Sequence, residues 1–210
     1  MFKVKICGIT NVEDYLAAAS LGTDFAGFVF YRSSPRYISP RFVQNLSKHF
    51  SLPVKKVGVF VNESIENIKK IYNETGLDIV QLHGDESPDF CGELGLPFWK
   101  VIRVRNRKSL EQMNLYDCGT YLLDTFVRDK PGGTSLPFDW KIAQEAVDNG
   151  FQVVIAGGIS SENIEAVSSL QPYGIDVSSS LEEYPGKKSI EKMTRFFSII
   201  RRIRGDNEQR

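Results

Sequence analysis

Short apolar runs alternate with longer amphipathic segments along almost the whole chain. The first run, residues 4–7, alternates apolar and polar residues and ends at Gly8, which predicts a strand that stops in a turn. Most later runs are continuously apolar, which is typical of strands in a parallel sheet that helices cover. The predicted strands span residues 4–7, 25–30, 56–61, 79–83, 99–104, 121–124, 152–156 and 175–177.

An amphipathic segment follows each run and predicts a helix. Asn11 suits the N-cap of the first helix, and Pro40 suits the first turn of the second. Ser160 or Ser161 is predicted to cap the short helix after the seventh run. The expected helices begin near residues 11, 39, 62, 87, 108, 139, 160 and 188, and the last one ends at about residue 204.

Eight strand–helix units in 210 residues predict an α/β fold, a single-domain (β/α)8 TIM barrel, whose smallest members have about 200 residues. A doubly wound open sheet is the alternative. That fold usually has fewer strands and a glycine fingerprint after its first strand, whereas no G-x-G-x-x-G follows residue 7. We expect one barrel domain over residues 1–205 and a polar C-terminal tail over residues 206–210.

Composition narrows the class of partners. The chain is 41% hydrophobic and 25% charged, which is ordinary for a globular domain with a sizeable core. Basic and acidic residues are equal at 26 each, so no overall field attracts nucleic acid or an anionic membrane. No run reaches membrane-spanning length, and Cys7, Cys91 and Cys118 show neither disulfide nor zinc spacing. We expect a cytoplasmic protein that binds neither nucleic acid nor membranes.

Chemically reactive side chains occur where the predicted strands end, which is where barrels of this type carry their active sites. Cys7 is a candidate base or nucleophile, although a lone cysteine is more often a buried filler. Asp124 could serve as a general acid if partly desolvated, or it could form the turn before Thr125. The strand-end residues are Cys7, Arg36, Asn62, His83, Arg103, Asp124, Gly157, Gly158, Ser178, Ser179 and Ser180.

The last two of these loops predict an anion site. Gly157-Gly158 and Ser178-Ser179-Ser180 can present backbone N–H groups to a phosphate, as loops at this place in the fold frequently do. A tight turn and helix caps are the alternative. Arg36 could bind a substrate carboxylate bidentately and His83 could polarise a substrate, although a loop arginine is usually solvated and such a histidine is as often structural. A small phosphorylated substrate is therefore favoured.

Two charged residues are expected beneath the strand ends. Lys5 and Asp176 each lie two residues before a strand end and should point into the barrel. Because the first and eighth strands become neighbours when the barrel closes, the two side chains predict a buried ion pair that supports Cys7. A Schiff base on Lys5, as in barrel aldolases, is the alternative; its position below Cys7 and its carboxylate neighbour disfavour it.

Short motifs at the strand ends follow one another in a characteristic order. They include Lys5-Ile6-Cys7-Gly8-Ile9-Thr10, Ser34-Pro35-Arg36-Tyr37-Ile38, Gln81-Leu82-His83-Gly84, Leu122-Leu123-Asp124, Gly132-Gly133-Thr134, Ala156-Gly157-Gly158-Ile159, Asp176-Val177-Ser178-Ser179 and Pro185-Gly186-Lys187. Over nearly the whole chain they resemble the phosphoribosylanthranilate isomerase family. The resemblance implies a cofactor-free Amadori rearrangement in tryptophan biosynthesis, in which N-(5-phosphoribosyl)anthranilate becomes the corresponding 1-deoxyribulose phosphate.

The resemblance also implies roles for individual residues. Asp124 would be the general acid that protonates the furanose ring oxygen, and Cys7, as thiolate, would be the general base that removes the C2 proton. Arg36 would meet the anthranilate carboxylate, and His83 would lie beside the reacting sugar. No metal is implied, and the sequence leaves a monomer and a homodimer open. The remaining substrate-binding residues would be Gly133, Gly157, Gly158, Ser178, Ser179 and Ser180.

Two positions depart from the family pattern, which usually has glycine where this chain has Ser135 and Ser180. A left-handed Ser180 would be strained by roughly 1–2 kcal/mol, and a side chain that crowds the phosphate would weaken binding. Two other functions stay open: an aldolase or epimerase of phosphosugars that uses Lys5 or a metal, and a silent barrel that binds phosphorylated metabolites. The strand ends lack a metal-binding cluster of His, Asp and Glu, and the presence of both acid and base disfavours a silent barrel.

Overall fold

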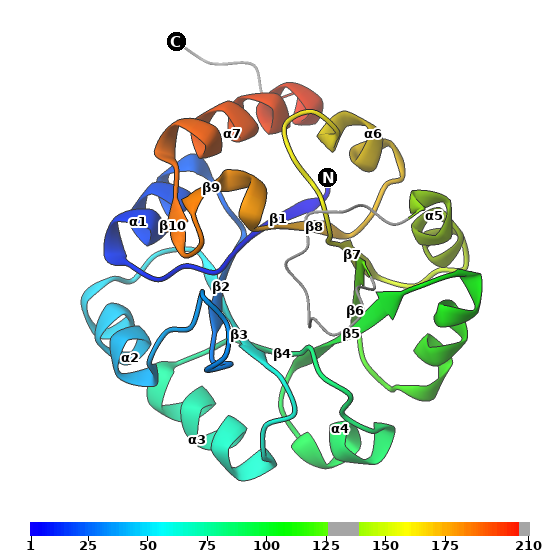
Figure 1. Ribbon diagram of the computed structural model, residues 1–210, viewed down its shortest axis with the longest axis horizontal. Helices are drawn as coiled ribbons and strands as arrows, with labels where there is room; N and C mark the ends of the chain where they lie inside the picture. Colours follow the sequence, from blue (N-terminus) through cyan, green and yellow to red (C-terminus); the bar gives the residue numbers. More distant parts are fainter. Residues whose placement is uncertain (126–138, 206–210) are drawn as a thin grey trace.

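Eight parallel strands close into a barrel in chain order, which confirms the predicted fold class (Figure 1). The computed structural model describes residues 1–125 and 139–205. The predicted tail over residues 206–210 lies outside this range, so the domain boundary stays a prediction. The strands are β1 (Lys3–Cys7), β2 (Phe25–Val29), β3 (Lys55–Phe60), β4 (Ile79–Leu82), β5 (Phe98–Val104), β6 (Thr120–Thr125), β7 (Val153–Ile155) and β8 (Gly174–Val177).

Helices surround the strands as an outer ring (Figure 1). Their bounds are α1 (Val12–Leu21), α2 (Pro40–His49), α3 (Ile65–Thr75), α4 (Pro88–Leu94), α5 (Trp140–Asp148), α6 (Ile164–Ser169) and α7 (Ile190–Arg204). The segment predicted as a helix near residue 108 is the 3-10 helix η1 (Arg107–Leu115). Within the described ranges no helix is long and apolar enough to cross a membrane.

Polar caps start most of the helices. The Asn11 side chain accepts the backbone N–H of Asp14, as the sequence predicts for an N-cap. The predicted cap of α6 is wrong, because that helix begins after Asn163 rather than after Ser160 or Ser161. Asn163 Oδ1 instead accepts the N–H of Ser160, and this bond draws the intervening residues into a turn.

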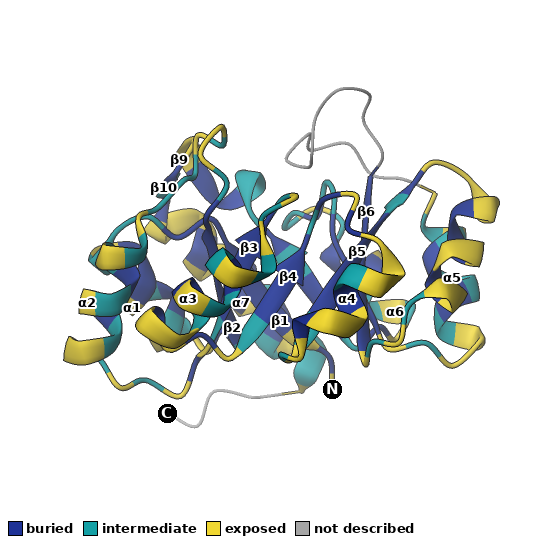
Figure 2. Ribbon diagram, turned by 90° about the horizontal axis from the view of Figure 1, so that it is seen from below, coloured by how far each residue is buried: buried dark blue, intermediate teal, exposed yellow. Residues whose placement is uncertain are grey.

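Among the described residues, the buried apolar side chains form a large cluster between the strands and the helices, a cluster inside the barrel, and a small third cluster of Cys7, Val29 and Val59. Figure 2 shows the strands largely buried and the outer faces of the helices exposed. Within the barrel, Phe25 and Trp99 pack edge to face with their ring centroids 4.9 Å apart. These apolar side chains fill the barrel interior, so polar residues can project only above them. The interior cluster consists of Phe25, Val57, Trp99, Val101, Leu122, Val154 and Ala156.

A short hairpin between β8 and α7 was not predicted. Its strands are β9 (Glu182–Tyr184) and β10 (Lys187–Lys188), joined through a turn in which Gly186 has a φ of 92°. Figure 2 shows the hairpin standing above the body of the barrel. Lys188, expected to open the last helix, belongs to β10, and the helix starts one residue later with Ser189 as its N-cap.

A buried ion pair supports the loop after β4. Lys100 projects from β5 and donates to Glu86 at 2.6 Å and to the carbonyl of Gly84 at 2.9 Å. Glu86 also accepts the backbone N–H of Asn62 at 2.9 Å, so it ties the ends of β3 and β4 together. Side chains of both Lys100 and Glu86 are almost fully buried. The loop that follows His83 therefore depends on a charge pair that water does not screen.

Removing the Glu86 carboxylate should destabilise the whole barrel. In Glu86→Ala the buried Lys100 ammonium loses its counter-ion, which typically lowers the free energy of unfolding by about 3–5 kcal/mol. Urea denaturation measures this change. Glu145→Ala, which removes the partner of the exposed Arg107, should cost no more than about 1 kcal/mol. Equal costs in the two variants would contradict the role of the buried pair.

Candidate active site

The floor of the candidate site is the predicted ion pair between Lys5 and Asp176. The two residues lie opposite each other on β1 and β8, and Lys5 Nζ donates to Asp176 Oδ2 at 2.9 Å. Their side chains are 1% and 9% exposed, so the pair is buried as expected. Burial alone lowers the pKa of Lys5, but Asp176 and Cys7 more than offset this and hold it above its ordinary value. Asp176 Oδ1 has no hydrogen-bond partner among the described residues.

Cys7 ends β1 directly above Lys5. A Cβ at Gly27, its neighbour on β2, would lie 2.8 Å from Cys7 Sγ and 3.1 Å from Lys5 Cε. The missing side chain at Gly27 therefore lets the thiol and the lysine side chain converge beside β2. Burial raises the pKa of Cys7 above its ordinary value, and the Lys5 ammonium opposes this rise.

Asp124 is the penultimate residue of β6 and faces His83, which follows β4. His83 Nε2 lies 3.3 Å from Asp124 Oδ2 and has no hydrogen-bond partner among the described residues. Gln81 Nε2 lies 3.1 Å from His83 Nδ1, so the two ring nitrogens face different groups. Asp124 Oδ1 accepts the N–H of Thr125 at 2.7 Å. The second oxygen of Asp124 is therefore the one that faces His83.

The absence of a side chain at Gly157 leaves room for Asp124 and Thr125. Its φ is 81°, and a Cβ there would overlap Thr125 Oγ1 and lie 3.0 Å from Asp124 Oδ1. Gly158 follows with a φ of 68°, so two successive left-handed residues turn the chain sharply after β7. Close approach of Thr125 and Asp124 requires glycine at Gly157, and the left-handed backbone favours glycine at Gly158; both stay candidates for anion binding.

Hydrogen bonds from serine link the loops after β1, β7 and β8. Ser178 Oγ donates to the carbonyl of Cys7 at 3.0 Å, and Ser180 Oγ donates to the carbonyl of Ile159 at 2.6 Å. Ser180 lies in the 3-10 helix η2 (Ser179–Leu181) and is not left-handed. The strain that a left-handed Ser180 would carry is therefore absent, because the 3-10 turn provides a conformation that any residue adopts. Gly133 and Ser135 lie outside the described residues.

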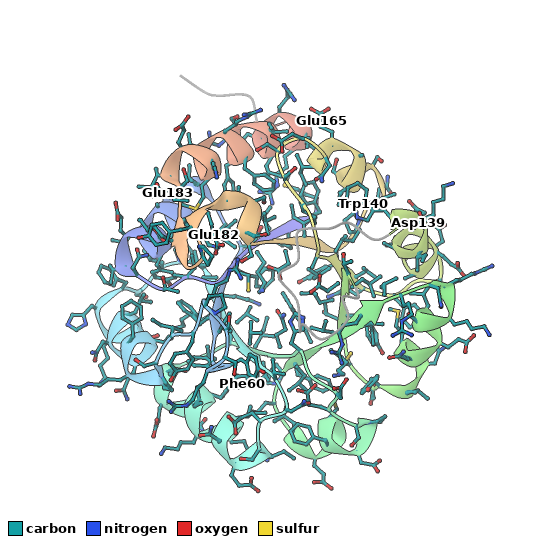
Figure 3. The ribbon with its side chains drawn as sticks, viewed as in Figure 1. Phe60, Asp139, Trp140, Glu165, Glu182 and Glu183 are labelled. Atoms are coloured by element: carbon teal, nitrogen blue, oxygen red, sulfur yellow. The ribbon has the colours of Figure 1, made fainter. Side chains whose placement is uncertain are left out.

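Arg36 lies beside Cys7 and is engaged by a residue that sequence reasoning missed. Its Nε and Nη2 donate to the two carboxylate oxygens of Glu182 at 2.8 and 2.6 Å. A Cβ at Gly8 would lie 2.6 Å from Arg36 Cδ, so this glycine gives the arginine stem its path. Figure 3 shows Glu182 nearer the barrel axis than its exposed neighbour Glu183. The only sequence signal for this contact was the Pro185-Gly186 turn.

The structure does not bring every strand-end residue into one cluster. Asn62 has a φ of 49°, and its Oδ1 accepts the N–H of Asp85 at 2.7 Å. Arg103 forms an ion pair with Asp85 as well. Both residues therefore hold the loop after β4. Cys7 lies on β1, His83 lies directly after β4, and Asp124 lies on β6. Arg36 and the loop of residues 178–180 lie on the β1 side of these residues.

Taken together, the closed barrel and its polar strand ends define an enzyme of the (β/α)8 class, with a thiol and a carboxyl group at the mouth of the barrel. The family model described as N-(5'phosphoribosyl)anthranilate (PRA) isomerase matches residues 4–199. The chain therefore belongs to the N-(5'-phosphoribosyl)anthranilate isomerase family, the aldose–ketose isomerases of tryptophan biosynthesis, which confirms the resemblance noted in its motifs.

Curated and solved relatives agree with this assignment. The N-(5'-phosphoribosyl)anthranilate isomerase of Pelobacter propionicus is 41% identical to this chain over 208 residues. The alignment covers 99% of each of the two chains. Monomers generated from the dimeric phosphoribosylanthranilate isomerase of Thermotoga maritima give a TM-score of 0.84 at 37% identity, covering 98% of this chain and 100% of that one. A phosphoribosylanthranilate isomerase in complex with reduced 1-(o-carboxyphenylamino)-1-deoxyribulose 5-phosphate gives 0.85 at 35% identity, with the same coverage.

A side chain at Gly157 should impair turnover without unfolding the barrel. In Gly157→Ala the new methyl group displaces Asp124, and a displacement of about 1 Å in a catalytic group costs on the order of 100-fold in rate. Gly150→Ala is the matched control, since Gly150 has a φ of 84° but no described atom within 4 Å of the added Cβ. Isomerase assays and thermal denaturation separate the two effects. Similar rates in both variants would show that Gly157 does not position Asp124.

Proposed function

We propose that this chain converts N-(5'-phosphoribosyl)anthranilate into 1-(2-carboxyphenylamino)-1-deoxyribulose 5-phosphate by an Amadori rearrangement that needs no cofactor. The observation that carries the proposal is the placement of Cys7 and Asp124 on β1 and β6 at the mouth of one barrel. An acid and a base on separate strands can act on two sides of a small sugar. The relative that binds a reduced form of this product supports the choice of ligand.

Asp124 is the general acid in this proposal. Its Oδ1 already accepts the N–H of Thr125, so Oδ2 is the oxygen that carries the proton. Transfer of that proton to the furanose ring oxygen breaks the C1–O bond and leaves an iminium ion between C1 and the anthranilate nitrogen. His83 Nε2 lies 3.3 Å from Asp124 Oδ2, close enough to donate to this carboxylate once Asp124 is ionised.

Cys7 is the general base. Its thiolate removes the proton from C2 of the iminium ion, and the electron pair of that C–H bond neutralises the nitrogen to give an enolamine. The enolamine then tautomerises to the ketone, so the sum of the steps is an isomerisation. Lys5 supports the thiolate because its ammonium lies beneath Cys7 in surroundings that otherwise raise the thiol pKa.

The two anionic ends of the substrate bind on the β1 side of the mouth. Arg36 takes the anthranilate carboxylate. The phosphate lies against the loops that contain Gly157, Gly158 and residues 178–180, whereas Gly133 lies outside the described residues. Because the hydroxyls of Ser178 and Ser180 already donate to carbonyl groups, the phosphate is met by backbone N–H groups of these loops.

A Schiff-base aldolase is less well supported. A lysine must lose its proton to attack a carbonyl group, and burial usually helps it to do so. Here Asp176 holds the pKa of Lys5 above its ordinary value, which keeps the amine protonated. The cytoplasmic location and the choice between monomer and homodimer stay predictions from the sequence.

Loss of either reacting group should abolish turnover while the barrel survives. Asp124→Asn cannot donate the acidic proton, and Cys7→Ala cannot accept the C2 proton; each such group contributes about 100- to 10,000-fold to the rate. The loss of anthranilate fluorescence on conversion measures turnover, and growth of a tryptophan auxotroph that lacks this step measures it in cells. Cys118→Ala is the control thiol variant. A rate near that of the unaltered enzyme in Asp124→Asn or Cys7→Ala would refute the role of that residue.

Substitutions of Lys5 and of Asp176 should shift the pH dependence of turnover in opposite directions. We expect kcat/KM to rise with pH as Cys7 ionises. Lys5→Met removes a cation that favours the thiolate, so the pKa of Cys7 and the rise move to higher pH. Asp176→Asn removes an anion that disfavours the thiolate, and the charge of Cys7 itself still favours a protonated Lys5, so both move to lower pH.

Alkylation of Cys7 by iodoacetamide, followed against pH in a Cys118→Ala background, measures the thiol directly. Lys3→Met is the control, since Lys3 lies on the same strand but forms an exposed pair with Asp24. A shift of the same sign in Lys5→Met and Asp176→Asn would show that charge beneath the thiol does not set its ionisation.

A further inference from the structure

Glu182 is a buried carboxylate that the acid–base chemistry does not use. Its side chain is 4% exposed and lies between the guanidinium of Arg36 and the ammonium of Lys188, whose Nζ donates to it at 2.9 Å. Burial by itself raises the pKa of Glu182, but hydrogen bonds from Arg36 and the charge of Lys188 hold it below its ordinary value. The carboxylate is therefore ionised and fully engaged by these two cations.

The contact with Glu182 occupies one particular edge of the Arg36 guanidinium. A guanidinium has five N–H donors arranged along two edges that can each meet a carboxylate in parallel. Glu182 takes the side edge, through Nε and Nη2. Within the described part of the chain, the end edge, formed by Nη1 and the second N–H of Nη2, donates to no protein group and can meet another carboxylate. Glu182 thus determines which edge Arg36 presents to the mouth of the barrel.

The surroundings leave Arg36 little freedom to turn. The arginine stem crosses Gly8, where a Cβ would lie 2.6 Å from Arg36 Cδ, and its side chain is only 14% exposed. Glu182 is itself held by Lys188 and by the N–H of Gly186 at 3.3 Å. Since each partner is anchored in turn, the end edge has a defined direction before any ligand arrives.

Lys188 extends the same contacts to the loop after β8. Its ammonium is completely buried and donates to the carbonyl of Ser178 at 3.2 Å, while Ser178 Oγ donates to the carbonyl of Cys7. Glu182 is therefore the shared counter-ion of the carboxylate-binding arginine and of a lysine that fixes the proposed phosphate loop. It joins the two anion-binding points on this side of the site.

We propose that Glu182 is a positioning residue for the isomerase reaction. It holds Arg36 by the side edge so that the end edge meets the carboxylate of the aromatic ring, and it does not itself touch the substrate. This inference rests on the proposed function, because it takes Arg36 as the ligand of the substrate carboxylate. Without Glu182, the arginine would have to be ordered at the moment of binding, which weakens affinity.

The test compares two substrates that differ only in the group Arg36 binds. Phosphoribosylanthranilate carries the carboxylate, and phosphoribosylaniline lacks it. In Glu182→Gln the amide can accept from only one of the two donors, and its NH2 group opposes the cations. We expect kcat/KM for phosphoribosylanthranilate to fall by about 10- to 100-fold, mainly through KM, as for the loss of a hydrogen bond to a charged group. The loss with phosphoribosylaniline should stay below about threefold.

Three further variants complete the experiment. Glu183→Gln changes the exposed neighbour on β9 and should leave both substrates unaffected. In an Arg36→Ala background, Glu182→Gln should add less than about threefold, because the two residues act as one unit. Glu182→Asp keeps the charge that pairs with Lys188 but is too short to reach both nitrogens of Arg36. Its kcat/KM should therefore also fall mainly for phosphoribosylanthranilate, the substrate that carries the carboxylate.

The outcomes separate the inference from the function on which it rests. Equal losses with both substrates in Glu182→Gln and Glu182→Asp would mean that Glu182 only maintains the fold, and would overturn the positioning role. A normal KM for phosphoribosylanthranilate in Glu182→Gln, together with a raised KM in Arg36→Ala, would also overturn the positioning role of Glu182. Arg36 would then keep its proposed role. If Arg36→Ala itself left the KM for phosphoribosylanthranilate unchanged, the assignment of Arg36 under the proposed function would fail.

Discussion

The site depends on one buried ion pair at the seam where the barrel closes. Lys5 and Asp176 lie opposite each other on β1 and β8, the first and last strands of the sheet. Closure brings them together, and an isolated charge at either position would be very costly. Their pairing keeps Lys5 protonated directly beneath Cys7, where burial would otherwise disfavour the thiolate. The contact that seals the sheet thus also lies beneath the residue proposed as the base.

Glycines let the remaining side chains reach this centre. Gly27 leaves room beside β2 for the thiol of Cys7, Gly157 leaves room for Asp124, and Gly8 gives Arg36 its path across the end of β1. At each position an added Cβ would lie 3.0 Å or less from an atom of a functional residue or of its immediate neighbour. Asp124, Cys7 and Arg36 are therefore positioned by close packing as well as by charge.

Each of the buried lysines around the mouth of the barrel, and Arg36, has a carboxylate partner. Lys5 is matched by Asp176, Lys188 and Arg36 share Glu182, and Lys100 is matched by Glu86 behind the loop after β4. Buried cations of this kind retain their protons only with such partners. The arrangement explains how several lysine and arginine side chains can surround a substrate with two anionic ends in a chain whose formal net charge is zero.

The sequence by itself determined the barrel, the order of its strands and the residues at their ends, because periodicity and turn residues act over a few positions. It also determined the Lys5–Asp176 pair, since closing eight strands makes the first and last neighbours. Only the tertiary structure decided that Arg36 is held by Glu182, 146 residues away, that the segment before α7 is a hairpin, and that Ser180 is unstrained. Side-chain contacts between loops leave no periodic trace in a sequence, because they depend on where the folded strands place those loops.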